Sequence, residues 1–314
     1  MVKIKDIHDL KSLKYQNSVL TIGNFDGVHS GHQQIISEVI RNATLLNCSP
    51  ILLTFSPHPL YFFQKDKSNF LLTNESLKTV LIKELGIHTI ITVPFNEKLA
   101  NIHPDVFIEE YITTPFNPKK IIIGHDFRFG KGRKGTAGIL KEKEHNYGFS
   151  VEIIDEITMG ALRISSSNIR KFIQEGKMEE ANKMLGYDFI LSGEVIKGDG
   201  IGKTINYPTA NLKVTNDLLP AQGVYAGYGK INKVKKTALI NIGSRPTIKD
   251  TDTISVEIHF LDTPPETSLY GQTVEVRVLK KIREEKKFKN VEELKEQIKK
   301  DEETAKKLLL NLRK

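Results

Sequence analysis

The chain has 314 residues, which is long for a single hydrophobic core and favours two domains. Its composition, 27% charged and 39% hydrophobic, is that of a soluble globular protein, and no apolar run approaches the roughly 18 residues of a membrane span. The formal net charge is +8, but basic and acidic residues are mixed and no basic block or RNA-binding motif occurs. Small polyphosphates are therefore a simpler explanation of the charge than nucleic acid or a membrane surface.

Two further features indicate the compartment. Cys48 is the only cysteine, which excludes an internal disulfide and fits a reducing environment. Residues 1–10 carry Lys and Asp side chains without an apolar core, so they do not have the pattern of a signal peptide. We therefore expect a cytoplasmic protein without a membrane partner.

The first 185 or so residues alternate between strand and helix patterns. One strand is expected to end at residues 19–22, and further strands are expected over 49–55, 88–95, 119–124 and 149–155. Helices are expected from Gly31 onward and over 75–85, 106–112 and 138–145. Strands separated by helices predict a Rossmann-like parallel sheet with right-handed crossovers, with ligands bound beyond the carboxyl ends of the strands.

The loop of residues 21–36 lies between the first strand and the first helix. Unpaired N–H groups at a helix start favour an anion, and His29 and His32, three residues apart, can point to one spot. The alternatives are a plain surface loop and a metal site, but beyond Asp26 no acidic or Cys side chain is close enough to complete the latter. The candidate nucleotide-binding residues here are Gly23, Asn24, Phe25, Asp26 and Gly31.

Three more loops follow strands of the same sheet. Residues 54–59 hold His58 between two prolines, with a bare turn as the alternative. Residues 124–135 combine aromatic and basic side chains, which suits a planar ring that carries phosphates. Residues 164–170 begin a helix with three serines and place Arg170 one turn inside it, more than an ordinary N-cap requires.

The pattern changes after a short helix over 178–186. From residue 187, short apolar runs alternate with turns, which predicts an antiparallel barrel or sandwich. The expected strands cover 190–195, 223–228, 237–242, 254–260 and 273–278. A last helix, from 291 to about 310, has interleaved charges that indicate a solvated face. The domains are therefore expected at 1–186 and 187–314.

The glycine-rich segment 198–204 looks at first like a P-loop. Position 197, where the first glycine of that motif belongs, is a lysine, and Pro208 prevents a following helix. The glycines can still form a flap whose backbone covers phosphates. The nucleotide-binding candidates in this flap are Gly198, Gly200, Gly202 and Lys203.

The loop of residues 21–36 resembles the G-x-F-D-x-x-H-x-G-H signature of nucleotidyltransferases, and the four loops together are similar to the first domain of bacterial bifunctional riboflavin kinase/FAD synthetases. By this resemblance, four catalytic residues would handle ATP phosphates: His29, His32, Ser166 and Arg170. The flavin-binding candidates are His58, Asp126, Phe127, Arg128 and Phe129. Many members have Arg where this chain has Leu71, so the flavin-phosphate contact would pass to Lys65, Lys67, Arg128 or Lys131.

The second half resembles riboflavin kinases through P-T-A-N at 208–211 and through segments in the same order downstream. By this resemblance Thr209 and Asn211 would hold Mg²⁺ with the nucleotide, and Glu257 would accept the proton of the riboflavin 5′-hydroxyl. The strand pattern alone makes Glu257 an outward-facing residue. Relatives often have Arg and Phe or Tyr where this chain has Lys203 and Asn206, which predicts weaker nucleotide binding.

The resemblance implies two ATP-dependent steps on small molecules, riboflavin to FMN and then FMN to FAD, without nucleic acid. A kinase whose first domain is inactive is one alternative. A flavin-sensing regulator that binds RNA or a partner is another, but it predicts decayed catalytic positions or an added basic surface. The oligomeric state, the need for reduced flavin and the transfer of FMN between sites stay open.

Overall fold

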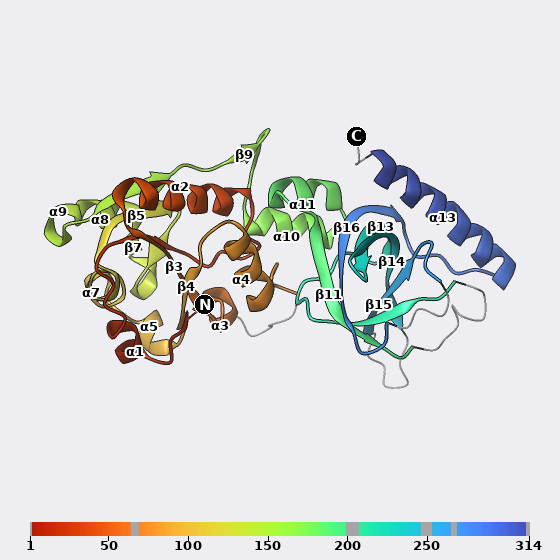
Figure 1. Ribbon diagram of the computed structural model, residues 1–314, viewed down its shortest axis with the longest axis horizontal. Helices are drawn as coiled ribbons and strands as arrows, with labels where there is room; N and C mark the ends of the chain where they lie inside the picture. Colours follow the sequence, from red (N-terminus) through yellow and green to blue (C-terminus); the bar gives the residue numbers. More distant parts are fainter. Residues whose placement is uncertain (1, 64–68, 199–206, 246–252, 265–268, 312–314) are drawn as a thin grey trace. The chain divides into compact units, whose positions relative to one another are not determined.

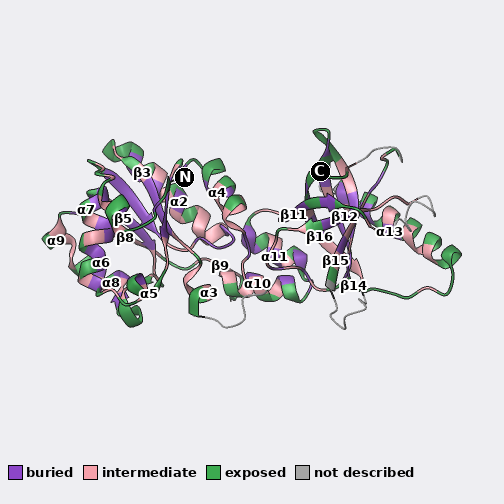
Figure 2. Cartoon of the chain, turned by 90° about the horizontal axis from the view of Figure 1, so that it is seen from below, coloured by how far each residue is buried: buried purple, intermediate pink, exposed green. Residues whose placement is uncertain are grey.

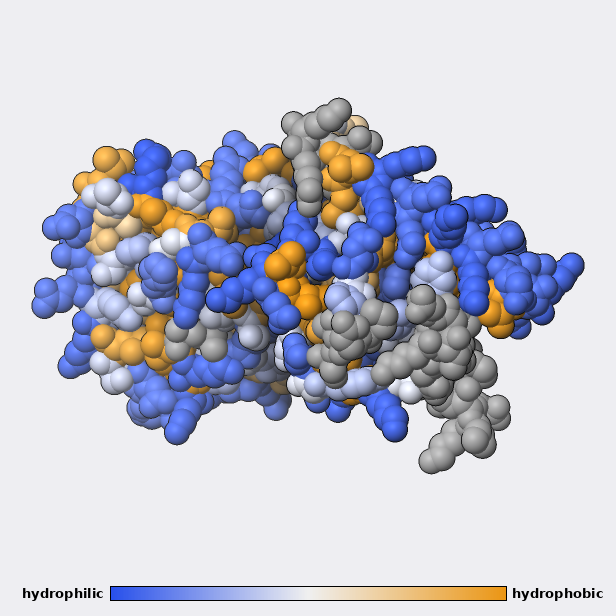
Figure 3. Space-filling view, turned by 45° about the vertical axis from the view of Figure 1, so that its right-hand side comes forward, coloured by the Kyte–Doolittle hydropathy of each residue, from blue (hydrophilic) through white to orange (hydrophobic). Residues whose placement is uncertain are grey.

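The computed structural model describes residues 2–63, 69–198, 207–245, 253–264 and 269–311 (Figure 1). The chain divides into two compact units, residues 1–166 and 167–314, which are described separately. Within the described residues, no helix is long and apolar enough to span a membrane. Figure 3 shows hydrophilic side chains over most of one face, with small hydrophobic patches between them.

The first unit is built on a six-stranded sheet in the order β1-β4-β3-β2-β5-β8, and every neighbouring pair is parallel. The strands are β1 (Val2–Lys3), β2 (Ser18–Ile22), β3 (Ser49–Ser56), β4 (Thr89–Pro94), β5 (Pro118–Gly124) and β8 (Ser150–Ile154). The expected strands and the parallel sheet are therefore confirmed. The short edge strand β1 was not expected.

Helices cover both faces of this sheet (Figures 1 and 2), which is why its strands have nearly continuous apolar runs. The helix α2 (Ser30–Leu46) packs on β2, β3 and β5. On the opposite face, buried side chains of the sheet form one cluster with α1 (Ile7–Lys11) and the helical segments between 104 and 116. The other helices of the unit are α3 (Pro59–Phe63), α4 (Glu75–Glu84), α5 (Glu97–Ala100), α6 (Pro104–Phe107), the π-helical turn Ile108–Thr113, α7 (Thr114–Phe116), the 3-10 turn Lys131–Arg133, α8 (Ala137–Glu142) and α9 (Glu144–Tyr147).

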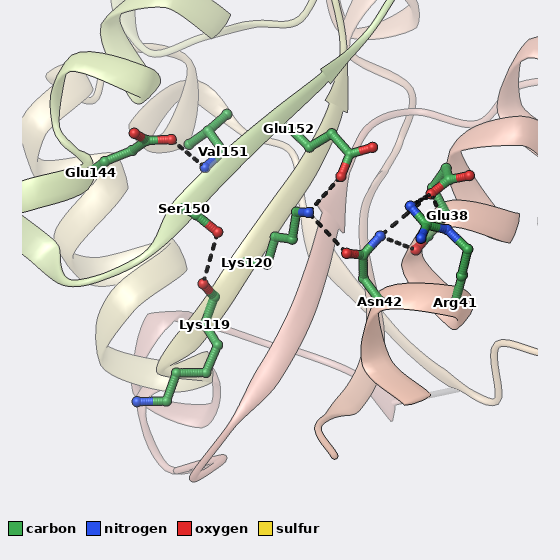
Figure 4. A network of polar contacts seen from close by, with 9 residues as sticks. All are labelled: Glu38, Arg41, Asn42, Lys119, Lys120, Glu144, Ser150, Val151 and Glu152. Atoms are coloured by element: carbon green, nitrogen blue, oxygen red, sulfur yellow. Dashed lines mark hydrogen bonds and ion pairs between the residues drawn. The ribbon is translucent and has the colours of Figure 1, made fainter. Parts of the chain in front are cut away.

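A polar network fastens α2 to the sheet (Figure 4). The ammonium of Lys120 on β5 lies 2.6 Å from the Glu152 carboxylate on β8 and 2.9 Å from the amide oxygen of Asn42 on α2. The Asn42 amide donates in turn to the Glu38 carbonyl, one turn earlier in α2. Because partly buried charges need partners, this network favours one position of α2, whose first turn carries His32 and which begins directly after His29.

The second unit is a closed barrel of six antiparallel strands in the order β11-β12-β15-β14-β13-β16. The strands are β11 (Phe189–Ile196), β12 (Ala210–Val214), β13 (Gly223–Ile231), β14 (Val234–Arg245), β15 (Thr253–Phe260) and β16 (Thr273–Arg283). Of the two expected architectures, barrel and sandwich, the barrel is the one observed. The strand β12 was not among the expected elements.

The terminal helix α13 (Val291–Asn311) packs on the outside of the barrel. Its Ala305 lies in an apolar cluster with Val224, Ala226, Leu239 and Leu261 of the barrel. Most of its charged residues face solvent as expected, but Asp301 is only 2% exposed. A charged residue at that depth needs a partner, which is Arg283 at the end of β16, with nitrogen-to-oxygen distances of 2.9 and 3.0 Å.

Two helices precede the barrel, α10 (Ser166–Gln174) and α11 (Met178–Leu185). Met178, Ala181, Met184 and Leu185 of α11 are buried. The Asn182 amide donates to the carbonyl of Val278 on β16 at 2.8 Å and accepts from the amide of Phe189 on β11 at 2.9 Å. These contacts join α11 to the barrel. The compact units divide at Ser166/Ser167, and the expected domain boundary at 186/187 stays a prediction.

Candidate active sites

The histidine loop connects β2 to α2 in the first unit. Phe25 and Val28 have φ angles of 51° and 39°, and Gly27 has 82°. Left-handed conformations at bulky residues are unfavourable and tend to occur at functional sites. His29 precedes the first residue of α2, and its ring stacks on that of His32 with centroids 3.7 Å apart. The expected pairing of the two histidines at one spot is therefore confirmed.

The two rings are held neutral. Burial lowers the pKa of His29 to about 4, an effect that nearby Asp126 opposes and Arg163 reinforces. Burial, then the charges of His29 and Lys78, lower the pKa of His32 well below its ordinary value. Within the described part of the chain, the Nδ1 atom of each ring is buried without a hydrogen-bond partner. Buried polar atoms are usually paired, so these two nitrogens indicate a place for a polar ligand.

Asp26 connects this loop to residues 72–73 through hydrogen bonds. Its Oδ1 atom accepts hydrogen bonds from the backbone amides of Leu72 and Thr73 at 3.0 and 3.2 Å. The hydroxyl of Thr73 accepts from the amide of Gly27 at 3.1 Å. The segment that holds Leu71 is thus attached directly to the histidine loop.

Lys78 on α4 is a residue of this site that sequence reasoning missed. Its ammonium donates to the carbonyl of Asn24 at 3.2 Å and to the hydroxyl of Thr54 at 3.3 Å. Burial lowers the pKa of Lys78, whereas Asp26 and Glu75 oppose that shift. A lysine in an amphipathic helix looks like a solvated charge in the sequence, so no local signal distinguished it.

Of the cations expected to replace an arginine at Leu71, Lys65 and Lys67 lie outside the described residues.

Ser166 reaches the same loop, because its hydroxyl donates to the carbonyl of Asp26 at 3.0 Å. The third of the expected loops therefore meets the first. Arg170 lies on α10 in the second compact unit, and its part in this site stays a prediction.

A second charged cluster lies beside the histidines. The carboxylate of Asp126, in the loop after β5, forms an ion pair with the guanidinium of Arg163. Arg163 lies on the short strand β10 (Leu162–Arg163), which is antiparallel to β9 (Thr158–Met159). The carboxylate of Glu156 lies 3.5 Å from the same guanidinium. Sequence reasoning did not single out Arg163, because its partners come from two other loops. The charge of Asp126 raises the pKa of His29 and that of Arg163 lowers it, so both charges act on the histidine stack.

The aromatic rings of the loop after β5 have different surroundings. Phe129 on β6 (Arg128–Phe129), which pairs with β7 (Gly135–Thr136), is buried in the core beside Phe107. Phe127 stacks on Phe129 with centroids 5.5 Å apart and is only partly buried. Phe129 therefore serves packing, and Phe127 is the ring with accessible surface. Arg128 is exposed.

His58, the flavin-binding candidate of the loop 54–59, is engaged in a local turn. Its Nδ1 atom accepts from the amide of Leu60 at 3.2 Å, and its ring lies edge-on to Phe70 at 5.2 Å. The turn that was the alternative reading is therefore present, and a role of His58 in binding flavin stays a prediction.

A cavity of about 570 Å³ opens at the carboxyl end of β8, where a parallel sheet is expected to bind ligands. It is bordered by Gln34 on α2 and by residues 153–158, including Glu156. The cavity is wide open to solvent rather than enclosed. The cavity thus shares α2 with the histidine stack and Glu156 with the Asp126–Arg163 pair.

Two candidate kinase residues of the barrel, Glu257 and Asn211, lie in one row with Asn241. Glu257 on β15 is in register with Asn211 on β12 and with Asn241 on β14. Directly opposed residues of antiparallel strands have Cβ atoms about 5 Å apart, so these three side chains are neighbours. Val256, Ile258 and Phe260 are buried, so Glu257 does face outward as the pattern predicts, and the outward face is where the row lies. Asn241 was not singled out in the sequence.

The Asn211 amide lies close to Gly198, the first residue of the glycine-rich segment. A Cβ atom at Gly198 would meet this amide, so a side chain there would make Asn211 shift. Gly200, Gly202 and Lys203 lie outside the described residues, as does Asn206. Thr209 comes directly before β12 and two residues before Asn211.

The two units define a two-part transferase in which a nucleotidyltransferase-like α/β domain precedes a kinase-like barrel. The FAD synthetase family model matches residues 11–168, and the riboflavin kinase family model matches residues 185–309. The chain belongs to the family of bifunctional riboflavin kinase/FMN adenylyltransferases.

Several relatives with this description match along their whole length. The one from Buchnera aphidicola subsp. Schizaphis graminum is 39% identical, and the match covers 98% of each chain. The one from Escherichia coli K12 is 35% identical with 97% of each chain covered, and the one from Bacillus subtilis 168 is 35% identical with 100% of this chain and 99% of the relative covered. A crystal structure described as a macrolide-efflux protein from Streptococcus pneumoniae shares the fold, with a TM-score of 0.88, 29% identity and coverage of 97% and 98%.

Proposed function

We propose that this chain converts riboflavin and ATP to FMN and ADP in the barrel, and then FMN and ATP to FAD and pyrophosphate in the first unit. The observation that carries the proposal is the end-to-end match to relatives described by both activities. Two family models that together span most of the chain support it.

In the adenylyl transfer, a phosphate oxygen of FMN attacks the α-phosphorus of ATP. That oxygen is already ionised at neutral pH, so the step needs no general base, and the enzyme contributes positioning and charge stabilisation. His29 and His32 would donate hydrogen bonds to the phosphates, and their unpartnered Nδ1 atoms support this role. Lys78 would add a positive charge behind the loop. Ser166 and Arg170 complete the proposed phosphate contacts.

The cavity at the end of β8 and the loop after β5 supply the remaining surfaces. We assign the cavity to part of a substrate, because it lies at the carboxyl end of a strand of the parallel sheet. Phe127, Asp126, Arg128 and His58 are proposed to contact the flavin, whereas Phe129 supports Phe127 from the core. The backbone between Gly23 and Gly31 would approach the phosphates.

In the kinase step, Glu257 would accept the proton of the riboflavin 5′-hydroxyl as that oxygen attacks the γ-phosphorus. Asn211 and Asn241 flank it in register and would hold the reactants. Gly198 and the other flap residues, Gly200, Gly202 and Lys203, would cover the nucleotide phosphates.

Mg²⁺ is the metal that this chemistry implies. Among the described residues no group of three His, Cys, Asp or Glu side chains could hold an ion. The Thr209 hydroxyl and the Asn211 amide oxygen do fit Mg²⁺, which takes one or two protein oxygens and completes its shell with phosphate and water. When bound, the ion would neutralise phosphate charge.

We propose that the enzyme works in the cytoplasm on small molecules only.

The direct test is chromatography of products from riboflavin, ATP and Mg²⁺ with purified protein. FMN followed by FAD is the expected result. FMN alone would indicate a single-activity kinase, and tight flavin binding without turnover would indicate a flavin-sensing regulator.

A further inference from the structure

His259 on β15 makes two polar contacts through its ring. Its Nδ1 atom lies 2.9 Å from the carbonyl oxygen of Pro208, and its Nε2 atom lies 3.0 Å from a carboxylate oxygen of Glu302. A backbone carbonyl can only accept, so Nδ1 carries the proton of the first bond. The ring of Tyr207 meets the imidazole edge-on at 5.6 Å. His259 thus contacts two successive residues of the segment that enters the kinase site.

This contact lies where the backbone ladder ends. The pairing of β12 with β15 runs from Leu212 to Ala210 and includes Asn211 opposite Glu257. Thr209 and Pro208 come before the first ladder pair. The hydrogen bond from His259 therefore attaches the chain beside Thr209 to β15. His259 is two residues after Glu257 on this strand, so both side chains are on its outward face.

The other side of the ring is held by α13. Glu302 follows Asp301, whose carboxylate pairs with Arg283 of the barrel. The Glu302 and His259 side chains are 22% and 14% exposed, so water competes little for their contact. Two adjacent acidic residues of α13 thus bind two different strands, and one of them orients the imidazole toward Pro208. Such outer-layer partners fix the orientation of a ligand-bearing residue.

We propose that His259 is a positioning residue of the kinase site, which holds Thr209 and Asn211 at Glu257 and makes that site depend on the docking of α13 through Glu302. The inference rests on the proposed kinase function of the barrel. His259 does not touch the reacting groups in this arrangement. Its effect passes through the Pro208 carbonyl to the two residues proposed to hold the Mg²⁺-nucleotide.

The test compares His259→Ala with His259→Asn, whose amide can replace the Nδ1 donor. In His259→Ala we expect kcat/KM for Mg²⁺–ATP to fall about 10- to 100-fold, the usual effect of losing an outer-layer partner. The KM for riboflavin should change little, and His259→Asn should recover most of the loss. Glu302→Gln should show a smaller decrease. Lys306→Ala is the matched control, because Lys306 joins the same helix to exposed Asp262.

A second measurement does not depend on turnover. Calorimetric binding of ADP should weaken in His259→Ala when Mg²⁺ is present and stay unchanged when it is absent. The rate at which the same variants adenylylate supplied FMN serves as a control that the rest of the chain is still folded and active. The proposal is overturned if His259→Ala keeps wild-type kinetics, or if riboflavin and ATP constants deteriorate together and His259→Asn rescues neither. A wild-type chain that forms no FMN would instead refute the kinase function itself.

Discussion

The imidazole ring of His29 stacks on that of His32 at a centroid distance of 3.7 Å and an interplanar angle of 19°. Two protonated rings at this distance would repel each other, so the stack suits two neutral rings. A polyphosphate placed against them would raise both pKa values, because opposite charge favours the protonated form.

Replacing both histidines tests their role in adenylyl transfer. We expect His29→Ala with His32→Ala to reduce FAD formation from FMN by about 10²-fold or more, because donors to developing phosphate charge are lost. Kinase activity of the same chain should persist. His88→Ala, a change of an exposed histidine in the same unit, is the control. Equal loss of both activities would mean that the pair is structural.

The burial of His29 also predicts a pH dependence of stability. Its pKa in the folded chain is about 4, below the ordinary value of 6.5, so the unfolded chain binds more protons between these values. Stability should therefore fall as pH decreases from 6.5 to 4, by about 3 kcal/mol from this group. Urea unfolding of wild type and His29→Asn at several pH values measures the effect. Parallel curves for the two proteins would contradict it.

Lys78→Met tests the cation that only the structure revealed. The substitution keeps the length of the side chain but removes its hydrogen bonds to the Asn24 carbonyl and the Thr54 hydroxyl. We expect FAD formation to fall roughly 10- to 100-fold, the range for hydrogen bonds of a charged group. Lys83→Met, on the exposed side of the same helix, should have no such effect. Unchanged FAD formation in Lys78→Met would remove the residue from the site.

Glu257→Gln tests the proposed base of the kinase. The amide keeps the size of the side chain but cannot take a proton, so riboflavin phosphorylation should fall roughly 10²- to 10⁴-fold. Adenylylation of supplied FMN should stay near wild type, and Glu275→Gln, a change of an exposed residue on β16, is the matched control. If binding of ADP–Mg²⁺ and riboflavin falls in proportion to the rate, Glu257 only shapes the pocket.

Two fragments test the boundary between the domains. Residues 187–314 should fold and phosphorylate riboflavin, as the change of sequence pattern predicts. Residues 167–314 should be more stable, because they keep α11, whose buried Met178 and Leu185 each contribute roughly 1.5–3 kcal/mol at full burial. Circular dichroism with thermal melts compares the two. A shorter fragment that is folded but inactive would contradict the assignment of the kinase to the barrel.

The sequence by itself determined the type and order of most elements. Apolar periodicity reports the local backbone, so the parallel sheet and the antiparallel second unit could be predicted without knowledge of neighbours. The histidine loop could be placed at a helix start, because three-residue spacing brings His29 and His32 together within one turn. Motif resemblance then indicated both activities, and the family matches agree with it.

Only the tertiary structure decided which distant residues meet. Closure of the barrel depends on the pairing of β11 with β16, the first and last barrel strands in the sequence, and no local pattern encodes this contact. The approach of Lys78 to Asn24, the pairing of Arg163 with Asp126 and the clamp of His259 on Pro208 have the same origin. Each joins segments far apart in the chain, and packing of the core sets their separation, whereas periodicity describes only residues that are close in sequence.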